Sequence, residues 1–442
     1  MTNASARERY WAARKFYESL LISERISPER LEKYQETQLQ QLLAHAAEHV
    51  PFYREPLSSI RNSDGRFDLD RWTELPIVSR DIVTAQWDEF QPSHLPEGHR
   101  AVLESTTSGS EGGSPLRMRK TRFEHTGVAC ASYRYADWFK YDYGTALAMI
   151  RAGFIRPANK DDPEDKLWGP PWIPQNRRGA RYRLDINVPV DEQMQWLRQL
   201  GTVYLNTLPS NAMALAQFAL AANEKPCLAG ILTVGERLSA DVRHEVQSIF
   251  GCQISDVYAT AECGLIAIEC PDTGNYHIQS EISKVEVLKA DGTQCTSGET
   301  GQVVATSLYN YAMPIIRYRF NDLVTLGDGC SCRRTLPVLS QIVGREKGLF
   351  KFDSGKVALP DYRTEKFREL AGTPYWQVAQ TSPTKVELRL KGCISMTDRL
   401  EKALTEYICS ILPAKVEVEI KRVTDFTRSR GGKFYPVIRE FR

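Results

Sequence analysis

The sequence predicts an α/β fold: a large N-terminal α/β domain with a parallel sheet and a β-rich subdomain, followed by a small C-terminal α+β domain. Three observations favour this fold. Strand and helix patterns alternate over residues 183–260, which is typical of a parallel sheet covered by helices. Alternating apolar and polar residues over 276–326 indicate strands with one buried face. A strand–helix–strand pattern after residue 384 indicates the small last domain.

The chain opens with helices. Apolar residues recur at helical spacing before Pro51, so we expect residues 1–60 to be helical. A short strand at 101–105 leads into a Thr/Ser/Gly tract, and 121–140 is predicted to form another helix. Residues 151–180 carry Pro, Gly, Arg and Asp without periodicity, which indicates a long loop.

The alternating region supplies the expected parallel sheet. Its strands are predicted at 201–206, 230–234 and 253–258, and its helices at 212–223 and 239–250. Strands at 385–390 and 415–420 are expected in the last domain. We expect the boundary near Gly344-Arg345, which gives an N-terminal domain over 1–343 and a C-terminal domain over 344–442.

Composition excludes several classes of protein. The 442 residues carry 57 Lys and Arg against 55 Asp and Glu, a net charge of +2, so no basic surface for nucleic acid is indicated. Apolar residues make up 42% and charged residues 25%, as in globular proteins rather than disordered ones. No apolar run approaches the ~18–20 residues of a membrane span. The first residues lack the pattern of a signal peptide, so we expect a cytoplasmic protein with no membrane partner.

A glycine-rich tract at 106–115 is the first candidate for chemistry. It reads Thr-Thr-Ser-Gly-Ser-Glu-Gly-Gly-Ser-Pro. Its backbone N–H groups and hydroxyls could surround a phosphate, because glycines free the backbone to turn tightly. No Gly-Lys-Ser/Thr closes the tract, so it is not a Walker loop. A flexible surface loop is the alternative.

Three further polar clusters follow. Glu262 lies in Asp256-Val-Tyr-Ala-Thr-Ala-Glu-Cys-Gly264, past a predicted buried strand, where a carboxylate could hold Mg²⁺. Asp322 closes the run Arg-Tyr-Arg-Phe-Asn-Asp and suits ribose hydroxyls, while Arg345 could neutralise phosphate or carboxylate. Lys433 follows two glycines near the C-terminus, on a tip that could carry an ammonium into a cleft. A solvated glutamate, an ordinary salt bridge and a disordered basic tail are the alternatives.

In this order, the four clusters resemble those of the adenylate-forming enzymes, in the branch of the phenylacetate–CoA ligase-like proteins. The likeness covers nearly the whole chain. It also includes His49-Val-Pro-Phe-Tyr53, Leu75-Pro76, Leu208-Pro-Ser210 and Thr233-Val-Gly-Glu-Arg-Leu238.

The resemblance implies ATP-dependent activation of a carboxylic acid. The acid would attack the α-phosphate of ATP, giving an acyl-adenylate and pyrophosphate, and CoA thiol would then take the acyl group. By resemblance, Lys433 would stabilise the adenylation transition state, Glu262 would bind Mg²⁺, and Arg345 would meet the ribose or the phosphates. The remaining nucleotide-binding residues would be Ser108, Gly109 and Ser110 at the phosphates, Gly235, Glu236, Arg237, Asp256 and Tyr258 at adenine, and Asp322 at the ribose. The C-terminal domain would swing between the two half-reactions.

Two departures from the family pattern concern ATP. Glu111 replaces a Thr in the glycine-rich tract, and one extra residue precedes Pro115. Ala261 stands where the family has Thr or Ser, and Thr260 would take over its hydroxyl. An anionic side chain beside phosphate is unfavourable unless it points away or helps to hold the metal.

Four residues form a candidate zinc site. Cys270 and His277 flank a turn, and Cys330 and Cys332 follow on a second, glycine-rich turn. Three thiolates and an imidazole suit a tetrahedral structural Zn²⁺. Some phenylacetate–CoA ligase-like proteins carry a similar set. The alternative is four reduced residues without a metal.

The sequence leaves the acid and its acceptor open. Tyr133, Tyr135, Trp138 and Phe139 are candidates to line the acyl pocket, which favours an aromatic acid; the alternative is that they are core residues. The acceptor could be an amine instead of CoA, which would make the protein an amide synthetase. A non-catalytic nucleotide- or acyl-binding relative is a second alternative. We expect a monomer or a homodimer.

Overall fold

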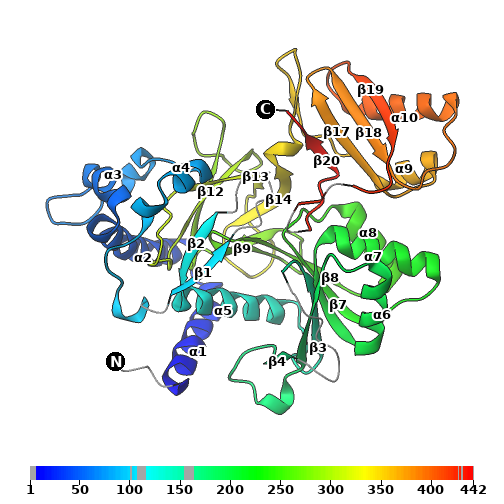
Figure 1. Cartoon of the computed structure of the whole chain (residues 1–442). Helices are drawn as coiled ribbons and strands as arrows, with labels where there is room; N and C mark the ends of the chain where they lie inside the picture. Colours follow the sequence, from blue (N-terminus) through cyan, green and yellow to red (C-terminus); the bar gives the residue numbers. More distant parts are fainter. Residues whose placement is uncertain are drawn as a thin grey trace.

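A mixed sheet runs through the centre of the molecule. The computed structural model describes residues 6–99, 102–106, 116–153, 164–426, 428–429 and 432–441. Its large sheet has 12 strands in the order β11-β12-β13-β14-β10-β9-β8-β7-β6-β3-β5-β4 (Figure 1). The predicted α/β fold class is therefore confirmed.

Five neighbouring strands of this sheet are parallel, and the alternating pattern predicts three of them, β6, β7 and β8. They are β5 (Ala180–Asp185), β3 (Ala146–Arg151), β6 (Val203–Thr207), β7 (Leu228–Val234) and β8 (Ile254–Thr260). The helices on one face are α6 (Val190–Leu200), α7 (Pro209–Ala222) and α8 (Ala240–Phe250) (Figure 1). Leu197, Leu215 and Val246 of these helices are fully buried in one apolar cluster with Ile231 of the sheet. Each such side chain contributes roughly 1.5–3 kcal/mol of burial free energy, which holds the helices on the sheet.

The other strands of the large sheet are antiparallel to their neighbours. They are β9 (Gly264–Glu269), β10 (Tyr276–Ile278), β14 (Val338–Arg345), β13 (Tyr318–Leu326), β12 (Thr300–Ser307) and β11 (Ser283–Leu288), with β4 (Glu164–Leu167) at the opposite edge. This part corresponds to the predicted β-rich subdomain. Strand β4 lies within the stretch predicted to be a loop. Its own sequence has no strand pattern, and it is a strand because it pairs with β5.

The N-terminal helices and one hairpin surround the antiparallel strands. These elements are α1 (Ala6–Ser23), α2 (Pro28–His49), α3 (Arg54–Ser59), α4 (Arg80–Ala85), α5 (Arg122–Trp138), β1 (Val102–Thr106) and β2 (Arg117–Thr121). Helix α2 ends just before Pro51, as predicted, because proline's restricted backbone biases the preceding residue away from helix. Strands β1 and β2 pair antiparallel and flank residues 107–115, which lie outside the described residues.

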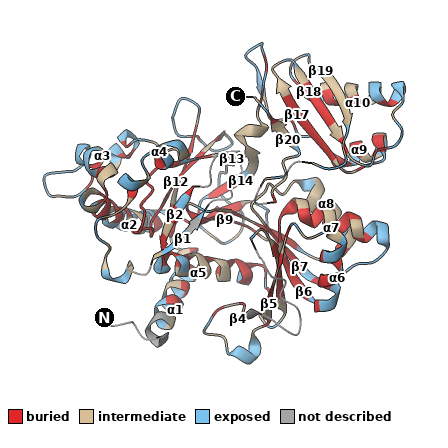
Figure 2. Cartoon of the chain, in the orientation of Figure 1, coloured by how far each residue is buried: buried red, intermediate tan, exposed pale blue. Residues whose placement is uncertain are grey.

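The C-terminal part has a sheet and an apolar cluster of its own. Its elements are β15 (Phe350–Lys351), β16 (Val357–Ala358), α9 (Thr364–Ala371), β17 (Trp376–Ser382), β18 (Lys385–Leu390), α10 (Asp398–Ile411), β19 (Glu417–Arg422) and β20 (Val437–Arg439). Four strands pair in the order β19-β18-β17-β20, and α9 and α10 cover one face (Figure 1). Phe367, Val378, Leu388 and Leu404 are fully buried between helices and sheet (Figure 2). The boundary at residue 344 stays a prediction.

The helices include one of 22 residues, α2, whose sequence mixes charged and polar side chains with apolar ones. Within the described ranges, none combines the length and the apolar character that a membrane-spanning helix needs.

Candidate active site and metal centre

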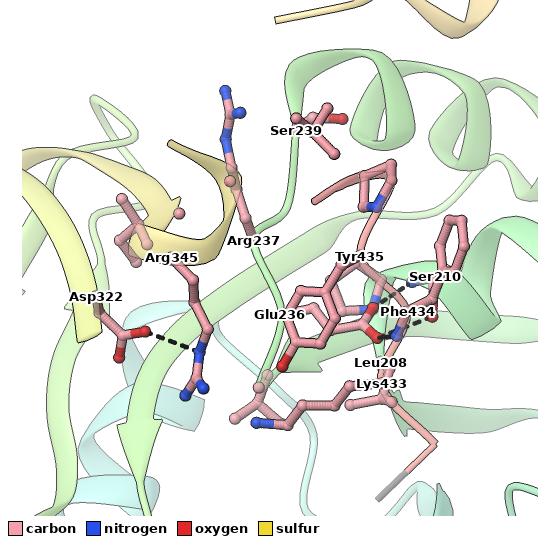
Figure 3. A pocket seen from close by; sticks show the side chains of 18 of the residues that line it. Leu208, Ser210, Glu236, Arg237, Ser239, Asp322, Arg345, Lys433, Phe434 and Tyr435 are labelled. Carbon is pink, nitrogen blue, oxygen red and sulfur yellow. Dashed lines mark hydrogen bonds and ion pairs between the residues drawn. The ribbon is translucent and has the colours of Figure 1, made fainter. Parts of the chain in front are cut away.

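A cavity of about 1120 Å³ lies where the C-terminal part faces the carboxyl ends of the parallel strands (Figure 3). Strand ends of this kind are where open α/β sheets bind ligands, because loops diverge there and leave a crevice. The predicted site residues that line the cavity are Gly235, Glu236, Arg237, Tyr258, Thr260, Glu262, Asp322, Arg345 and Lys433. The structure thus gathers residues from five segments of the chain. Ser108, Gly109 and Ser110 lie outside the described residues.

Asp322 is the centre of a polar cluster on one wall. The Tyr258 hydroxyl donates to Asp322 Oδ2 at 2.8 Å, and Arg345 Nε lies 3.1 Å from Oδ1 (Figure 3). Asp322 and Arg345 are paired residues of β13 and β14, so the sheet register sets their distance. A carboxylate has about four acceptor sites, so Asp322 could still accept hydroxyl groups of a bound sugar.

Glu262 lies just past β8, among groups of both charges. The Tyr318 hydroxyl lies 3.4 Å from Glu262 Oε1. Burial raises the pKa of Glu262 and the charge of Asp322 raises it further, whereas Arg345 and Arg80 lower it. A divalent cation would oppose these raising effects, because a positive charge favours the carboxylate form.

Arg80 and Arg151 also line the cavity. Arg80 begins α4 and lines the cavity near Glu262. Arg151 ends β3 and donates to Asn206 Oδ1 at 3.3 Å. Burial lowers the pKa of Arg151, while the charge of Glu236 raises it. Neither arginine stands in a recognisable sequence pattern, so only the strand and helix ends that carry them reveal their place.

Lys433 enters the cavity from the C-terminal loop. The backbone of Gly235 passes so near that a Cβ built there would lie 3.9 Å from Lys433 Nζ. Burial lowers the pKa of Lys433, and Arg345 and Arg151 lower it further, whereas Asp322 and Glu236 raise it. Its ammonium therefore lies near two other cations, and together they favour the binding of an anionic ligand.

Asp256 differs from its predicted place beside adenine. It is 1% exposed and does not line the cavity. Its carboxyl accepts hydrogen bonds from Thr233 Oγ1 at 2.6 Å and from the Tyr276 hydroxyl at 2.7 Å. These partners lie on other strands of the sheet and hold the carboxyl inside the protein, so its role is structural.

The predicted acyl-pocket residues of α5 also differ from expectation. Tyr135, Trp138 and Phe139 are buried, Tyr133 is half-buried, and none of the four lines the cavity. The Tyr135 hydroxyl bonds to Ser255, and Trp138 Nε1 donates to Glu24 at 2.8 Å. Tyr135 and Trp138 pack against the sheet, whereas the Tyr133 ring contacts Tyr17 of α1 and Trp172, so these rings serve packing.

Cys270, His277, Cys330 and Cys332 come together away from this cavity. Their ligand atoms all lie within 4.8 Å of one another. Cys330 Sγ lies 3.7 Å from Cys270 Sγ, and Cys332 Sγ lies 3.2 Å from His277 Nε2. The other ring nitrogen, Nδ1, lies 3.1 Å from the Leu336 carbonyl, so it donates there and leaves Nε2 to face the thiols. The donor set and its closeness fit a tetrahedral metal ion.

The sequence is similar to two phenylacetate-coenzyme A ligases. It is 25% identical to that of Escherichia coli (strain K12) over 449 residues, which cover 92% of this chain and 94% of the relative. It is 23% identical to that of Thermus thermophilus over 350 residues, which cover 73% of this chain and 72% of the relative. No family model matches the chain.

The fold is similar to that of 2-hydroxyisobutyryl-CoA ligase. Its crystal structure in the postadenylation state gives a TM-score of 0.74 at 19% identity, covering 100% of this chain and 94% of that chain. The same ligase in the thioesterification state gives 0.61 at 20% identity, covering 95% and 92%. The chain is thus similar in sequence to phenylacetate-coenzyme A ligases and similar in fold to 2-hydroxyisobutyryl-CoA ligase.

Proposed function

We propose that the protein is an AMP-forming acyl-CoA ligase, an acid–thiol ligase. It activates a carboxylic acid with ATP and passes the acyl group to the thiol of CoA. The observation that carries this proposal is the position of Lys433, which a C-terminal loop brings into the cavity that Glu262, Asp322 and Arg345 line. Cations, a ribose-binding acid and a metal-binding acid are the groups that this chemistry needs.

The first half-reaction joins the acid to AMP. A carboxylate oxygen bonds to the α-phosphorus of ATP while the bond to pyrophosphate breaks. Lys433 and Arg345 offset the negative charge that builds up, and Asp322 with Tyr258 holds the ribose. Mg²⁺ would neutralise the phosphates, and Glu262 is the residue that would bind it.

The second half-reaction moves the acyl group. The CoA thiol loses its proton, its sulfur bonds to the acyl carbon, and AMP leaves with the bonding electron pair. The C-terminal part would have to move before the thiol can approach.

Product analysis with a panel of acids tests this function. Purified protein with Mg-ATP, CoA and each acid should release AMP and pyrophosphate and form an acyl-CoA. Amide formation with amines and no thioester would instead show an amide synthetase. Nucleotide binding without pyrophosphate exchange for every acid would show a non-catalytic relative.

The panel should not be limited to aromatic acids. The aromatic side chains predicted to select such an acid, among them Tyr135 and Phe139, pack in the core. Phenylacetate stays in the panel because two similar proteins are named as its ligases. Small hydroxy acids join it because a structural neighbour is named as a 2-hydroxyisobutyryl-CoA ligase.

We propose further that the four-residue cluster binds a structural Zn²⁺. Four protein ligands leave no open position, so the ion would hold the β9–β10 turn to the β13–β14 turn. Three thiolates and Zn²⁺ carry a net charge of −1. Arg334 offsets it, since its Nη1 lies 3.9 Å from Cys270 Sγ and its backbone nitrogen lies 3.4 Å from Cys332 Sγ.

The cysteines also bear on location. None of the ten cysteines, all within the described residues, forms a disulfide, which suits a reducing compartment, so we propose a cytoplasmic location. Light scattering during gel filtration would distinguish the two expected states, a monomer and a homodimer.

A further inference from the structure

Glu236 holds the loop that carries Lys433. Its Oε1 accepts the backbone N–H of Phe434 at 2.7 Å, which is the peptide directly after Lys433 (Figure 3). Its Oε2 accepts the backbone N–H of Ser210 at 2.9 Å, and the Ser210 hydroxyl donates to Oε1 at 3.0 Å. One carboxylate thus joins the C-terminal loop to the first turn of α7.

The loop itself is a closed turn pressed onto the large domain. Ser429 closes it, because its backbone N–H donates to the Lys433 carbonyl at 2.9 Å and its hydroxyl accepts the Lys433 N–H at 3.1 Å. Arg428 donates to the Gly432 carbonyl at 3.0 Å and to the Ser210 hydroxyl at 3.3 Å. Gly432 has φ +75°, and a Cβ there would lie 2.6 Å from Ile186 Cγ2. The turn therefore approaches the domain as closely as glycine allows.

We propose that Glu236 is the positioning residue for Lys433 in adenylation, and that it acts through the Phe434 peptide rather than by touching the nucleotide. The inference rests on the proposed function. The resemblance assigned Glu236 to the border of adenine, but both its carboxylate oxygens already accept protein hydrogen bonds.

The physical reason is the flexibility of lysine. A lysine has four rotatable bonds, so its ammonium reaches a fixed point only where its own backbone is held. A charge-assisted hydrogen bond to the adjacent peptide supplies that hold. A misplacement of about 1 Å can cost about 10²-fold in rate, so the hold should be visible in kinetics.

The matched variants are Glu236→Gln and Glu299→Gln. The amide introduced by Glu236→Gln has a single carbonyl oxygen, so it cannot accept from both the Ser210 and the Phe434 peptide. Glu299 makes a similar set of bonds on the surface, to the N–H and hydroxyl of Thr296 and to Lys289, far from the cavity. It controls for the loss of a charge and of local hydrogen bonds.

A double-mutant cycle with Lys433→Ala tests the inference. Glu236→Gln should lower pyrophosphate exchange about 10- to 100-fold, and acyl transfer from a supplied acyl-adenylate to CoA much less. In the Lys433→Ala background it should lower exchange less than about twofold, because no ammonium remains to be positioned. Glu299→Gln should leave both half-reactions unchanged. An equal loss in both backgrounds, or a raised KM for ATP alone, would overturn the inference.

Limited trypsin digestion gives a readout that does not need activity. Glu236→Gln should speed cleavage within residues 428–433, and Glu299→Gln should not. The wild-type protein could show no pyrophosphate exchange with any acid while Glu236→Gln still speeds cleavage. That result would refute the proposed function but support the role of Glu236 in holding the loop. Unchanged cleavage would refute the docking whatever the activity.

Gly432→Ala keeps the test decisive should Glu236→Gln unfold the protein. Its Cβ would push the turn away from Ile186 without altering Glu236. It should lower exchange at least tenfold and speed the same cleavage, again with no further loss in the Lys433→Ala background. Normal exchange in Gly432→Ala would contradict the proposal.

Discussion

The Tyr276 hydroxyl donates a 2.7 Å hydrogen bond to Asp256 Oδ2. This bond joins strand β10, which also carries His277, to strand β8, which runs to the cavity. Arg243 bonds to Glu269 rather than to Asp256. Burial raises the pKa of Asp256 to about 7, the charge of Glu269 raises it, and Arg243 lowers it. The protonated acid therefore suits this interior better than the carboxylate.

This burial should make stability fall with rising pH. The pKa of Asp256 is about 7 in the folded protein, against about 3.9 in an unfolded chain. Between these values the folded state binds more protons, so the free energy of unfolding decreases as pH rises from about 4 to about 7. The full effect is of order 4 kcal/mol.

Asp256→Asn should remove this dependence. The free energy of unfolding should be measured with urea at pH 5 and pH 8. Between these pH values, wild type should lose ~2–3 kcal/mol more than the variant does. Asp291→Asn, at a fully exposed aspartate, should follow wild type. Parallel pH responses of wild type and Asp256→Asn would show that Asp256 does not cause the fall.

The cysteine–histidine cluster should contain one zinc ion per chain. Elemental analysis of protein purified without chelator should give this ratio, and Cys332→Ser should lose the metal. Losing ~2–3 kcal/mol of stability would lower the Tm by roughly 2–4 °C, because the unfolding entropy of a chain of this length is large. Cys227→Ser, at an exposed thiol outside the cluster, should keep both zinc and Tm. Wild-type protein free of metal would refute the site.

Glu262→Gln should weaken the use of Mg²⁺. The amide keeps the size of the side chain but loses the charge that binds a hard cation. We expect the Mg²⁺ concentration for half-maximal pyrophosphate exchange to rise at least tenfold, with an unchanged Tm. Glu299→Gln is again the matched control. Unaltered Mg²⁺ dependence would give Glu262 a structural role beside Tyr318.

The sequence predicts most of what depends on local order along the chain. The alternation over 183–260 predicts three of the five parallel strands, β6, β7 and β8, since period and length are local properties. Asp322 and Arg345 could be named because each closes a recognisable run, yet their pairing depends on the register of β13 with β14.

What the sequence cannot show is the direction in which a side chain points. Asp256 and Tyr258 lie two residues apart on one strand, and Tyr258 lines the cavity. The carboxyl of Asp256 is instead held in the interior by hydrogen bonds from Thr233 and Tyr276. Tyr135 and Trp138 of α5 face the sheet, where Tyr135 bonds to Ser255 and the Trp138 ring contacts that of His277. Arg80 lies in the cavity only because the chain fold brings α4 there.

Lys433→Ala should separate the two half-reactions. Its ammonium opposes charge that builds up only while the carboxylate attacks the α-phosphate, and that charge leaves with pyrophosphate. Losing one preorganised donor costs about 10²–10³-fold, so pyrophosphate exchange should fall by that factor. Acyl transfer from a synthetic acyl-adenylate to CoA should fall far less, because the lysine's task is complete by then. Lys402→Ala, on the exposed face of α10, should change neither rate. Normal pyrophosphate exchange with lost acyl transfer would instead assign the C-terminal loop to the acceptor step. That result would also contradict the proposal that Glu236 positions Lys433 for adenylation.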